Sequence, residues 1–95
     1  MQLFFDGTKV QSINEFHCVF SRLLGIEDYY GKNYHALRDV LSAAVERPCH
    51  LVWENSEASK VSLGDDFKLI IQIFEDTRLQ DEKYGWTDKF TYELK

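Results

Sequence analysis

The sequence predicts an α/β fold in which a three-stranded parallel sheet, with strands in the order 1-2-3, is covered by three to four helices in a two-layer arrangement. Short apolar runs stand near the start of the chain and in its middle, and an alternating apolar pattern stands near its end. Helical apolar periodicity fills the stretches between them. These stretches are long enough for right-handed crossovers between parallel strands. The length of 95 residues predicts a single domain spanning residues 1–95.

The first two expected elements are a strand and a helix. Residues 2–6 form a short apolar run that ends at Gly7, as expected of a first strand. Ser12 followed by Glu15 fits a capping box, which marks a helix start. The apolar side chains at helical spacing after it are Ile13, Phe16, Phe20, Leu23 and Leu24. Gly25 is the expected end of this helix.

A second helix and a central strand follow. Asn33 is the expected N-cap of the helix. Its apolar face would consist of Leu37, Val40, Leu41 and Ala44. The helix must end before Pro48, because the residue preceding a proline disfavours helical dihedral angles. Residues 50–54 contain the continuous apolar run that is typical of a central strand.

The last expected elements are a third helix and a third strand. Asp65 or Asp66 is the expected cap of the helix. Its apolar side chains at helical spacing are Phe67, Ile70, Ile71 and Phe74. Gly85 is expected in a turn, and the alternation after it predicts a strand through Phe90, Tyr92 and Leu94.

The charge balance indicates which partners to expect. Eleven Lys and Arg against sixteen Asp and Glu give 11 − 16 = −5. A net negative field repels nucleic-acid phosphates and anionic lipids and attracts basic proteins. We therefore expect a protein partner, and neither nucleic acid nor a membrane. Because the apolar runs are short and no signal-peptide pattern opens the chain, we expect a cytoplasmic protein.

The chain lacks the motifs of common catalytic and metal sites. It has no phosphate loop, GxSxG or HExxH, and no recognisable Cys–His spacing. Cys18 and Cys49 are expected to be reduced, largely buried thiols, and His17 a core histidine. We expect no cofactor and no enzymatic activity. One enzymatic alternative is a small hydrolase that uses His35 with Asp39, one helical turn apart.

The second helix and the loop before it form the most informative segment. The polar face of this helix consists of His35, Arg38, Asp39, Ser42 and Glu46. Two adjacent tyrosines, Tyr29 and Tyr30, stand in the glycine-containing loop that precedes it. Both cannot easily be buried, so we expect at least one to face water. Exposed tyrosine beside a charged helix face is typical of a protein-binding surface.

The pattern Tyr29-Tyr30-Gly31-x-Asn33-x-x-Ala36-Leu37-x-Asp39 resembles the signature of the barstar family, intracellular inhibitors of the secreted ribonuclease barnase and its relatives. Further matches are Ser12-Ile13, Pro48 before Leu51-x-Trp53, and Gln72-Ile73-Phe74-Glu75-Asp76. The resemblance spans about residues 3–94 and implies the fold predicted above.

The resemblance also implies a mechanism, in which loop and second helix plug the active site of the ribonuclease. Asp39 would replace a substrate phosphate among the arginines and lysine of the enzyme. Tyr29 would pack on its catalytic histidine, Gly31 and Asn33 would belong to the inserted loop, and Asp76 would add a peripheral ion pair.

Three positions depart from the family pattern. His35 replaces a second aspartate, and Arg38 and Ala44 replace tryptophans. The acidic pair is thus reduced to Asp39, which favours a diverged cognate ribonuclease toxin. The sequence predicts an immunity protein that occludes the active site of a basic ribonuclease and is a monomer when free. The alternative is a barstar-fold interaction module with a partner that is not a nuclease.

Overall fold

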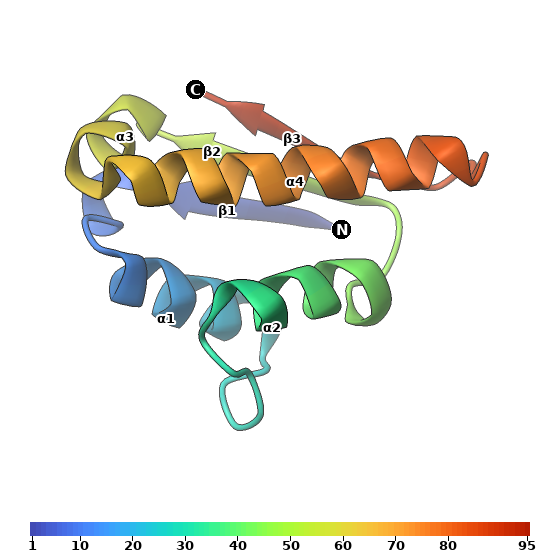
Figure 1. Cartoon of the computed structure of the whole chain (residues 1–95), viewed down its shortest axis with the longest axis horizontal. Coiled ribbons are helices and arrows are strands. Elements are labelled where there is room, and N and C mark those ends of the chain that lie inside the picture. Colours follow the sequence, from blue (N-terminus) through green and yellow to red (C-terminus); the bar gives the residue numbers. More distant parts are fainter.

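The computed structural model describes all residues 1–95, and its elements follow the predicted alternation (Figure 1). They are β1 (Gln2–Asp6), η1 (Gly7–Lys9), α1 (Ile13–Leu24), α2 (Tyr34–Asp39), η2 (Val40–Ala44), β2 (Cys49–Glu54), α3 (Ser56–Leu63), α4 (Asp65–Lys83) and β3 (Phe90–Leu94). The sheet has the order β1-β2-β3 with both pairs parallel, which confirms the predicted topology. No helix is both long enough and apolar enough to cross a membrane.

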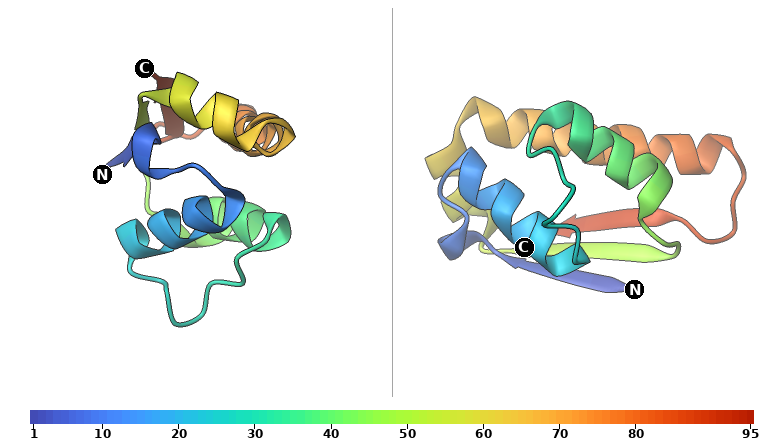
Figure 2. Two further views of the ribbon diagram at one scale, coloured as in Figure 1. Left: turned by 90° about the vertical axis from the view of Figure 1, so that its left-hand side faces the viewer. Right: turned by 90° about the horizontal axis from the view of Figure 1, so that it is seen from below.

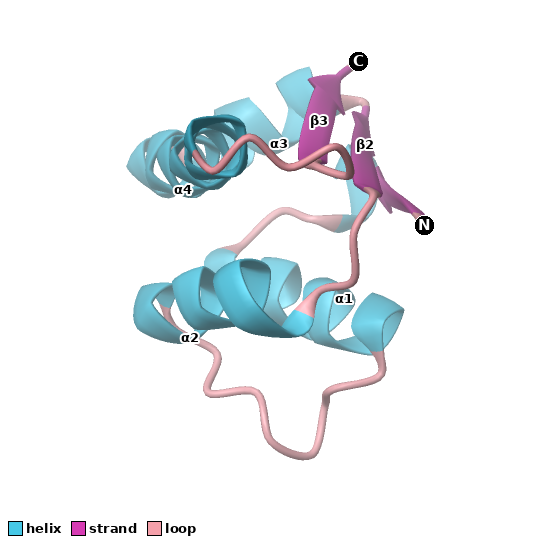
Figure 3. Ribbon diagram, turned by 90° about the vertical axis from the view of Figure 1, so that its right-hand side faces the viewer, coloured by secondary structure: helices cyan, strands magenta, loops and turns pink.

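The helices α1, α2 and α4 lie on one side of the sheet, and no helix covers the other side (Figure 3). In β1 this arrangement appears as strict alternation, with Leu3 and Phe5 buried and their neighbours exposed. The central strand β2 is buried at Leu51, Val52 and Trp53. The fold is therefore two-layered, with its core between the sheet and the helices.

Aromatic rings fill the centre of this core. The indole of Trp53 packs within 5.6 Å of the rings of both Phe5 and Phe16, centroid to centroid, and within 6.3 Å of Phe74. Its Nε1 donates a hydrogen bond of 3.0 Å to the hydroxyl of Ser59. The polar atom of the buried indole is thus satisfied, as a buried N–H requires.

The first helix begins and ends where the sequence predicts. The Ser12 hydroxyl accepts a hydrogen bond of 3.1 Å from the Glu15 amide, and Gly25 closes the helix with a left-handed φ of 69°. Leu23 shares the helical spacing of the apolar side chains but is 40% exposed. Leu23 lies at the edge of the sheet, where it lines a shallow groove with Phe4.

The second helix is capped as predicted, because the side chain of Asn33 accepts a hydrogen bond of 2.8 Å from the Ala36 amide. Ala44, which its spacing places on the apolar face of this helix, is exposed. The helix widens into the π-helical turn η2, in which the Val45 amide donates to the Val40 carbonyl five residues earlier. This wider turn rotates the register, so that Val45 enters the core and Ala44 faces outward.

The segment before the long helix differs from the prediction in two ways. It contains a helix that the sequence analysis missed, α3, which has few apolar residues and begins after Asn55 in a left-handed conformation. The residue that caps α4 is Gly64, so the prediction of Asp65 or Asp66 as the cap is wrong. Both aspartates lie in the first turn, where their negative charge interacts favourably with the positive end of the helix dipole.

A buried ion pair joins the end of the second helical segment to the end of α4. The Asp81 carboxylate accepts hydrogen bonds of 2.7 and 3.2 Å from the Arg47 guanidinium and one of 2.7 Å from the Phe90 amide. Arg47 also donates to the carbonyl groups of Val45 and Leu41, at 2.8 Å each. The side chains of Asp81 and Arg47 are 2% and 11% exposed, so the pair lies largely within the protein.

Replacing Asp81 by alanine should destabilise the protein by about 3–5 kcal/mol, because it leaves the Arg47 charge buried without its partner. Urea unfolding at neutral pH measures this loss. The matched control is Asp65→Ala, which removes an exposed carboxylate 4.0 Å from Lys68 and should cost less than about 1 kcal/mol. Equal effects of the two substitutions would contradict the role given to the buried pair.

Candidate functional site

The loop between α1 and α2 projects away from the sheet and the other helices (Figure 2). Its two tyrosines point in opposite directions, since 70% of Tyr29 is exposed but only 6% of Tyr30. This confirms that one of the pair faces water. The side chain of Tyr30 belongs to the core. We therefore expect Tyr30 to support the predicted binding surface from beneath.

Tyr30 fixes the loop to the first helix. Its hydroxyl lies 2.8 Å from Nδ1 of His17, and its ring packs 5.6 Å from that of Phe20, centroid to centroid. His17 is itself buried, as predicted from its place on the apolar side of the helix. Burial lowers the pKa of His17 below 6.5, so the imidazole is neutral at neutral pH.

The residues after Tyr30 shape the tip of the loop. A side chain at Gly31 would bring a Cβ within 3.2 Å of the Ala36 side chain, so the close approach favours glycine. Lys32 has a positive φ of 55°. Asn33 uses both ends of its amide within the chain, because it donates to the Gly31 carbonyl at 3.3 Å while its oxygen caps α2.

Two side-chain contacts hold the segment from Tyr34 to Arg47 against α4. At its start, the Tyr34 hydroxyl donates a hydrogen bond to the Asp66 carboxylate. At its end, Arg47 contacts Asp81 as described above. Neither contact follows from the sequence, because each joins positions more than thirty residues apart. The segment that carries Asp39 is therefore braced at both ends.

Asp39 is an exposed residue near the middle of this braced segment. Its carboxylate makes no hydrogen bond or ion pair within the chain, so it is free to contact a partner. His35 is also exposed, and no hydrogen bond or ion pair joins it to Asp39. The hydrolase alternative therefore lacks the paired geometry that a general base and its orienting acid require.

Arg38 and Asp76 are brought together across α2 and α4. One guanidinium nitrogen of Arg38 lies 3.0 Å from the Asp76 carboxylate, which also accepts a hydrogen bond of 2.8 Å from Gln72. The hydrogen bonds from Gln72 and Arg38 lower the pKa of Asp76, so it is ionised at neutral pH. Arg38 thus has its counter-ion within the chain and adds little positive field around Asp39.

The surface formed by residues 26–46 is acidic. Its exposed carboxylates are Glu27, Asp28, Asp39 and Glu46. The cations of this range are Lys32 and Arg38, and Arg38 is paired with Asp76. Four carboxylates therefore face one unpaired ammonium group, which favours a partner with a cationic surface.

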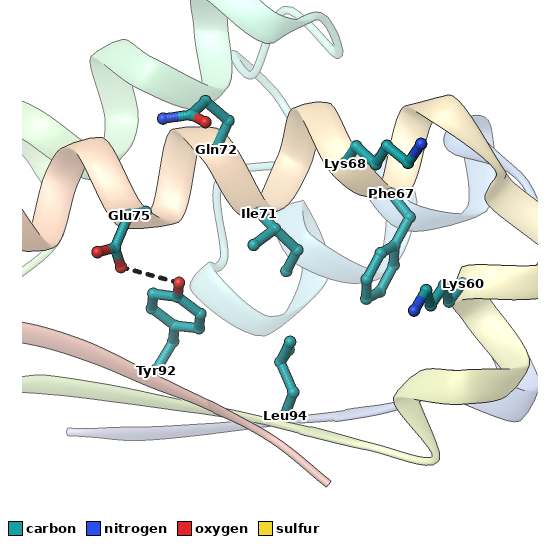
Figure 4. Close-up of a pocket in the computed structure, with 8 residues that line it drawn as sticks. All are labelled: Lys60, Phe67, Lys68, Ile71, Gln72, Glu75, Tyr92 and Leu94. Atoms are coloured by element: carbon teal, nitrogen blue, oxygen red, sulfur yellow. Dashed lines mark hydrogen bonds between the residues drawn. The ribbon is translucent and has the colours of Figure 1, made fainter.

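The largest hollow of the molecule lies elsewhere, between α4 and the edge strand β3 (Figure 4). In it Glu75 accepts a hydrogen bond of 2.9 Å from the Tyr92 hydroxyl and a bidentate contact from Arg78. These bonds, chiefly those from Arg78, lower the pKa of Glu75 to about 2. The carboxylate is thus unsuited to general acid chemistry at neutral pH, and no three metal-ligating side chains cluster anywhere in the chain.

Comparison with known proteins identifies the relatives of this chain. The family model described as Barstar (barnase inhibitor) matches residues 1–93. A protein of Bacillus subtilis (strain 168) named "Putative ribonuclease inhibitor YrdF" is 31% identical over 83 residues, which cover 85% of this chain and 91% of that protein. The similarity therefore extends over both the sheet and the segment from Tyr29 to Asp39.

Protonation of His17 should weaken the fold at mildly acidic pH. Because burial lowers its pKa, with Lys32 lowering and Asp66 raising it, the unfolded chain binds the proton first. The contribution of His17 is therefore complete above the unfolded value of 6.5 and declines as the pH falls from there toward the folded pKa. Urea unfolding between pH 7.5 and 5.5 measures this slope, which His17→Gln should reduce. An unchanged slope in that variant would contradict the assignment.

Proposed function

Because this chain belongs to the barstar family of barnase inhibitors, we propose that it inhibits a ribonuclease by covering the active site with its loop and second helix. The observation that carries the proposal is the free carboxylate of Asp39, exposed on a helix that is braced at both ends. The inhibitor named among its relatives supports the same role.

Asp39 has the chemistry of a phosphate substitute. A ribonuclease binds the phosphodiester of its substrate with cationic side chains, and a carboxylate offers the same two-oxygen geometry to a guanidinium group. Burying the carboxylate among several cations compensates its loss of hydration. Since the helix already holds Asp39 in place, little conformational entropy is lost on binding.

Tyr29 supplies the apolar part of the same contact. Its ring is exposed, while the adjacent Tyr30 fixes the backbone beneath it. An aromatic side chain of this kind buries a large area at low entropic cost and is common among residues that dominate binding energy. In the proposed complex Tyr29 packs against the catalytic histidine, and Gly31 and Asn33 shape the inserted loop.

The ion pair between Arg38 and Asp76 changes what the edge of the proposed interface can offer to the ribonuclease. In the family mechanism the acid at Asp76 meets a cation of the enzyme, but here it already meets Arg38. The proposed binding energy is therefore concentrated on Asp39 and Tyr29. His35 is exposed on the same helix as Asp39 and replaces the second aspartate of the family pattern. It therefore distinguishes this surface from one that fits barnase itself.

The proposed biological role is immunity, in which the protein protects a cell from a basic ribonuclease toxin inside the cytoplasm. The second candidate is an interaction module for a partner that is not a nuclease, with which the departures at His35 and Arg38 are also compatible. Co-purification from the source cell separates the two. A basic ribonuclease as the partner supports immunity, and an unrelated partner supports the module.

Substituting Asp39 by alanine should weaken inhibition of the cognate ribonuclease by about 2–5 kcal/mol, because the cations of the enzyme lose their buried counter-charge. Inhibition constants of purified variants measure this loss. Ser42→Ala removes a polar group from the same exposed helix face and serves as the control, with an effect below about 0.5 kcal/mol. Full inhibition by the Asp39 variant would refute the phosphate-substitute role.

Replacing His35 by aspartate should strengthen inhibition of barnase itself, because it adds a second carboxylate opposite the cationic site of that enzyme. The same substitution should weaken inhibition of the cognate ribonuclease if that enzyme has adapted to histidine. Both inhibition constants are measured side by side with the wild type. If neither constant changes, His35 lies outside the interface.

A further inference from the structure

The hollow between α4 and β3 is a groove that the proposed inhibition does not use (Figure 4). Its volume is about 400 Å³, and most of its exposed lining is apolar. The residues that line this α4–β3 groove are Lys60, Phe67, Lys68, Ile71, Gln72, Glu75, Tyr92 and Leu94. Its apolar wall includes Leu94, which is 42% exposed. Concave apolar surface of this kind is typical of binding sites.

One wall of the groove is an open edge of the sheet. The strand order β1-β2-β3 leaves β3 with a single neighbour, β2. The Lys95 amide donates a hydrogen bond of 2.9 Å to the Trp53 carbonyl, so every second residue back from Lys95 faces β2. The residues between them direct their amide and carbonyl groups away from β2. The main-chain groups of Tyr92 and Leu94 therefore lie on the open edge.

The open edge and the apolar lining can be used by one occupant. The side chains of Tyr92 and Leu94 point from β3 toward α4 (Figure 4). An extended segment that paired with β3 would run about 4.8 Å from it, and every second side chain of that segment would point the same way. These side chains would enter the groove and contact Phe67 and Ile71, while the main chain of the segment bonded to the edge. Strand addition of this kind is a common mode of peptide recognition.

Two lysines give one end of the groove a positive charge, although the chain carries a net charge of −5. Lys60 makes no ion pair within the chain. Lys68 has only Asp65 near it, at 4.0 Å, and the side chain of Asp65 is 98% exposed. Figure 4 shows both lysines at the end of the groove where Leu94 lies. A carboxylate beside the apolar side chains of an occupant would therefore be attracted to this end.

The one carboxylate that lines the groove does not cancel this charge. Glu75 lies at the other end, where it accepts hydrogen bonds from Arg78 and from the Tyr92 hydroxyl. Its negative charge is thus matched by a guanidinium group of the same helix. The lining residues therefore leave an excess of positive charge for an occupant to meet.

A second copy of this chain does not supply the matching charge. If two copies paired along β3, the side chains that each strand directed to the groove side would be Phe90, Tyr92 and Leu94. None of these is acidic, so the two lysines would remain without a counter-ion. The net charge of −5 on each copy also opposes association.

These features together define one class of occupant. We propose that the α4–β3 groove binds an extended segment of a partner protein, which adds a strand to β3. The segment has apolar side chains at every second position and an acidic residue opposite Lys60 and Lys68. The site lies outside the loop and second helix, so this inference does not depend on the proposed function.

Synthetic peptides of about eight residues test the proposal on the whole chain. In the first peptide leucine alternates with threonine, and a glutamate stands at each end, so that either strand direction brings a carboxylate to the lysines. A second peptide has lysine in place of both glutamates, and a third has a central proline, which cannot donate to a strand edge. Fluorescence polarisation measures the three dissociation constants. The second and third peptides should bind at least about tenfold more weakly than the first.

Matched substitutions locate the site on the protein. Leu94→Gln should weaken binding of the acidic peptide about fivefold or more, because it removes apolar surface from the groove. Leu79→Gln changes an equally exposed leucine outside the groove and should have less than about a twofold effect. Lys60→Glu should also weaken binding about fivefold or more, whereas Lys83→Glu makes the same change of net charge outside the groove and should have less than about a twofold effect. Thermal midpoints of the four variants show whether each is folded.

Weaker binding in the two groove variants alone, with a preference for the acidic peptide, supports the proposal. It is overturned if the acidic peptide does not bind below about 1 mM, or if the lysine peptide binds as strongly. Equal losses in the groove variants and their controls would also overturn it. Sedimentation of the chain alone tests the remaining occupant, because a dimer that Leu94→Gln abolishes would assign the groove to a second copy.

Discussion

The carboxylate of Asp81 is the point on which the arrangement of the helices depends. Asp81 belongs to the end of α4 and lies within the protein. Its carboxylate accepts hydrogen bonds from Arg47, in the turn that leads into β2, and from the Phe90 amide at the start of β3. A buried charge requires such complete pairing, so alternative positions of these elements are strongly disfavoured. Through Arg47 the constraint reaches the carbonyl groups of Leu41 and Val45, and it thereby fixes the helical segment that carries Asp39.

The proposed binding surface is held in place by contacts with the rest of the fold. Tyr34 holds the start of the segment to Asp66, and Tyr30 holds the preceding loop to His17, so that Tyr29 and Asp39 stand exposed on backbone that is already placed. An exposed anionic group and an exposed aromatic ring, both on a rigid backbone, suit a partner whose cleft has cations for the first and a flat ring for the second. The pair between Arg38 and Asp76 removes a cation from the field around Asp39.

Features that depend on a local sequence pattern could be predicted, whereas contacts between residues far apart in the chain could not. The strands, the capping by Ser12 and Asn33, and the parallel order all follow from periodicity and cap chemistry, and the structure confirms them. Helix α3 was missed because its short, polar sequence lacks an apolar stripe. The outward position of Ala44 depends on a π-helical turn, which standard helical spacing does not reveal. That at least one of Tyr29 and Tyr30 faces water was predicted from their adjacency. The contacts of Arg38 with Asp76 and of Arg47 with Asp81 could not be predicted, because they join residues far apart in the chain.

We propose that the loop and second helix, and not the large hollow beside β3, form the surface that binds the ribonuclease. Backbone amide chemical shifts of the labelled protein, recorded as an unlabelled barnase-type ribonuclease is added, test it most directly. We expect the largest changes in residues 29–46 and around Asp76, while the uncovered face of the sheet and the hollow shown in Figure 4 remain unaffected. Changes concentrated on Lys60, Ile71 and Tyr92, with residues 29–46 unchanged, would contradict it.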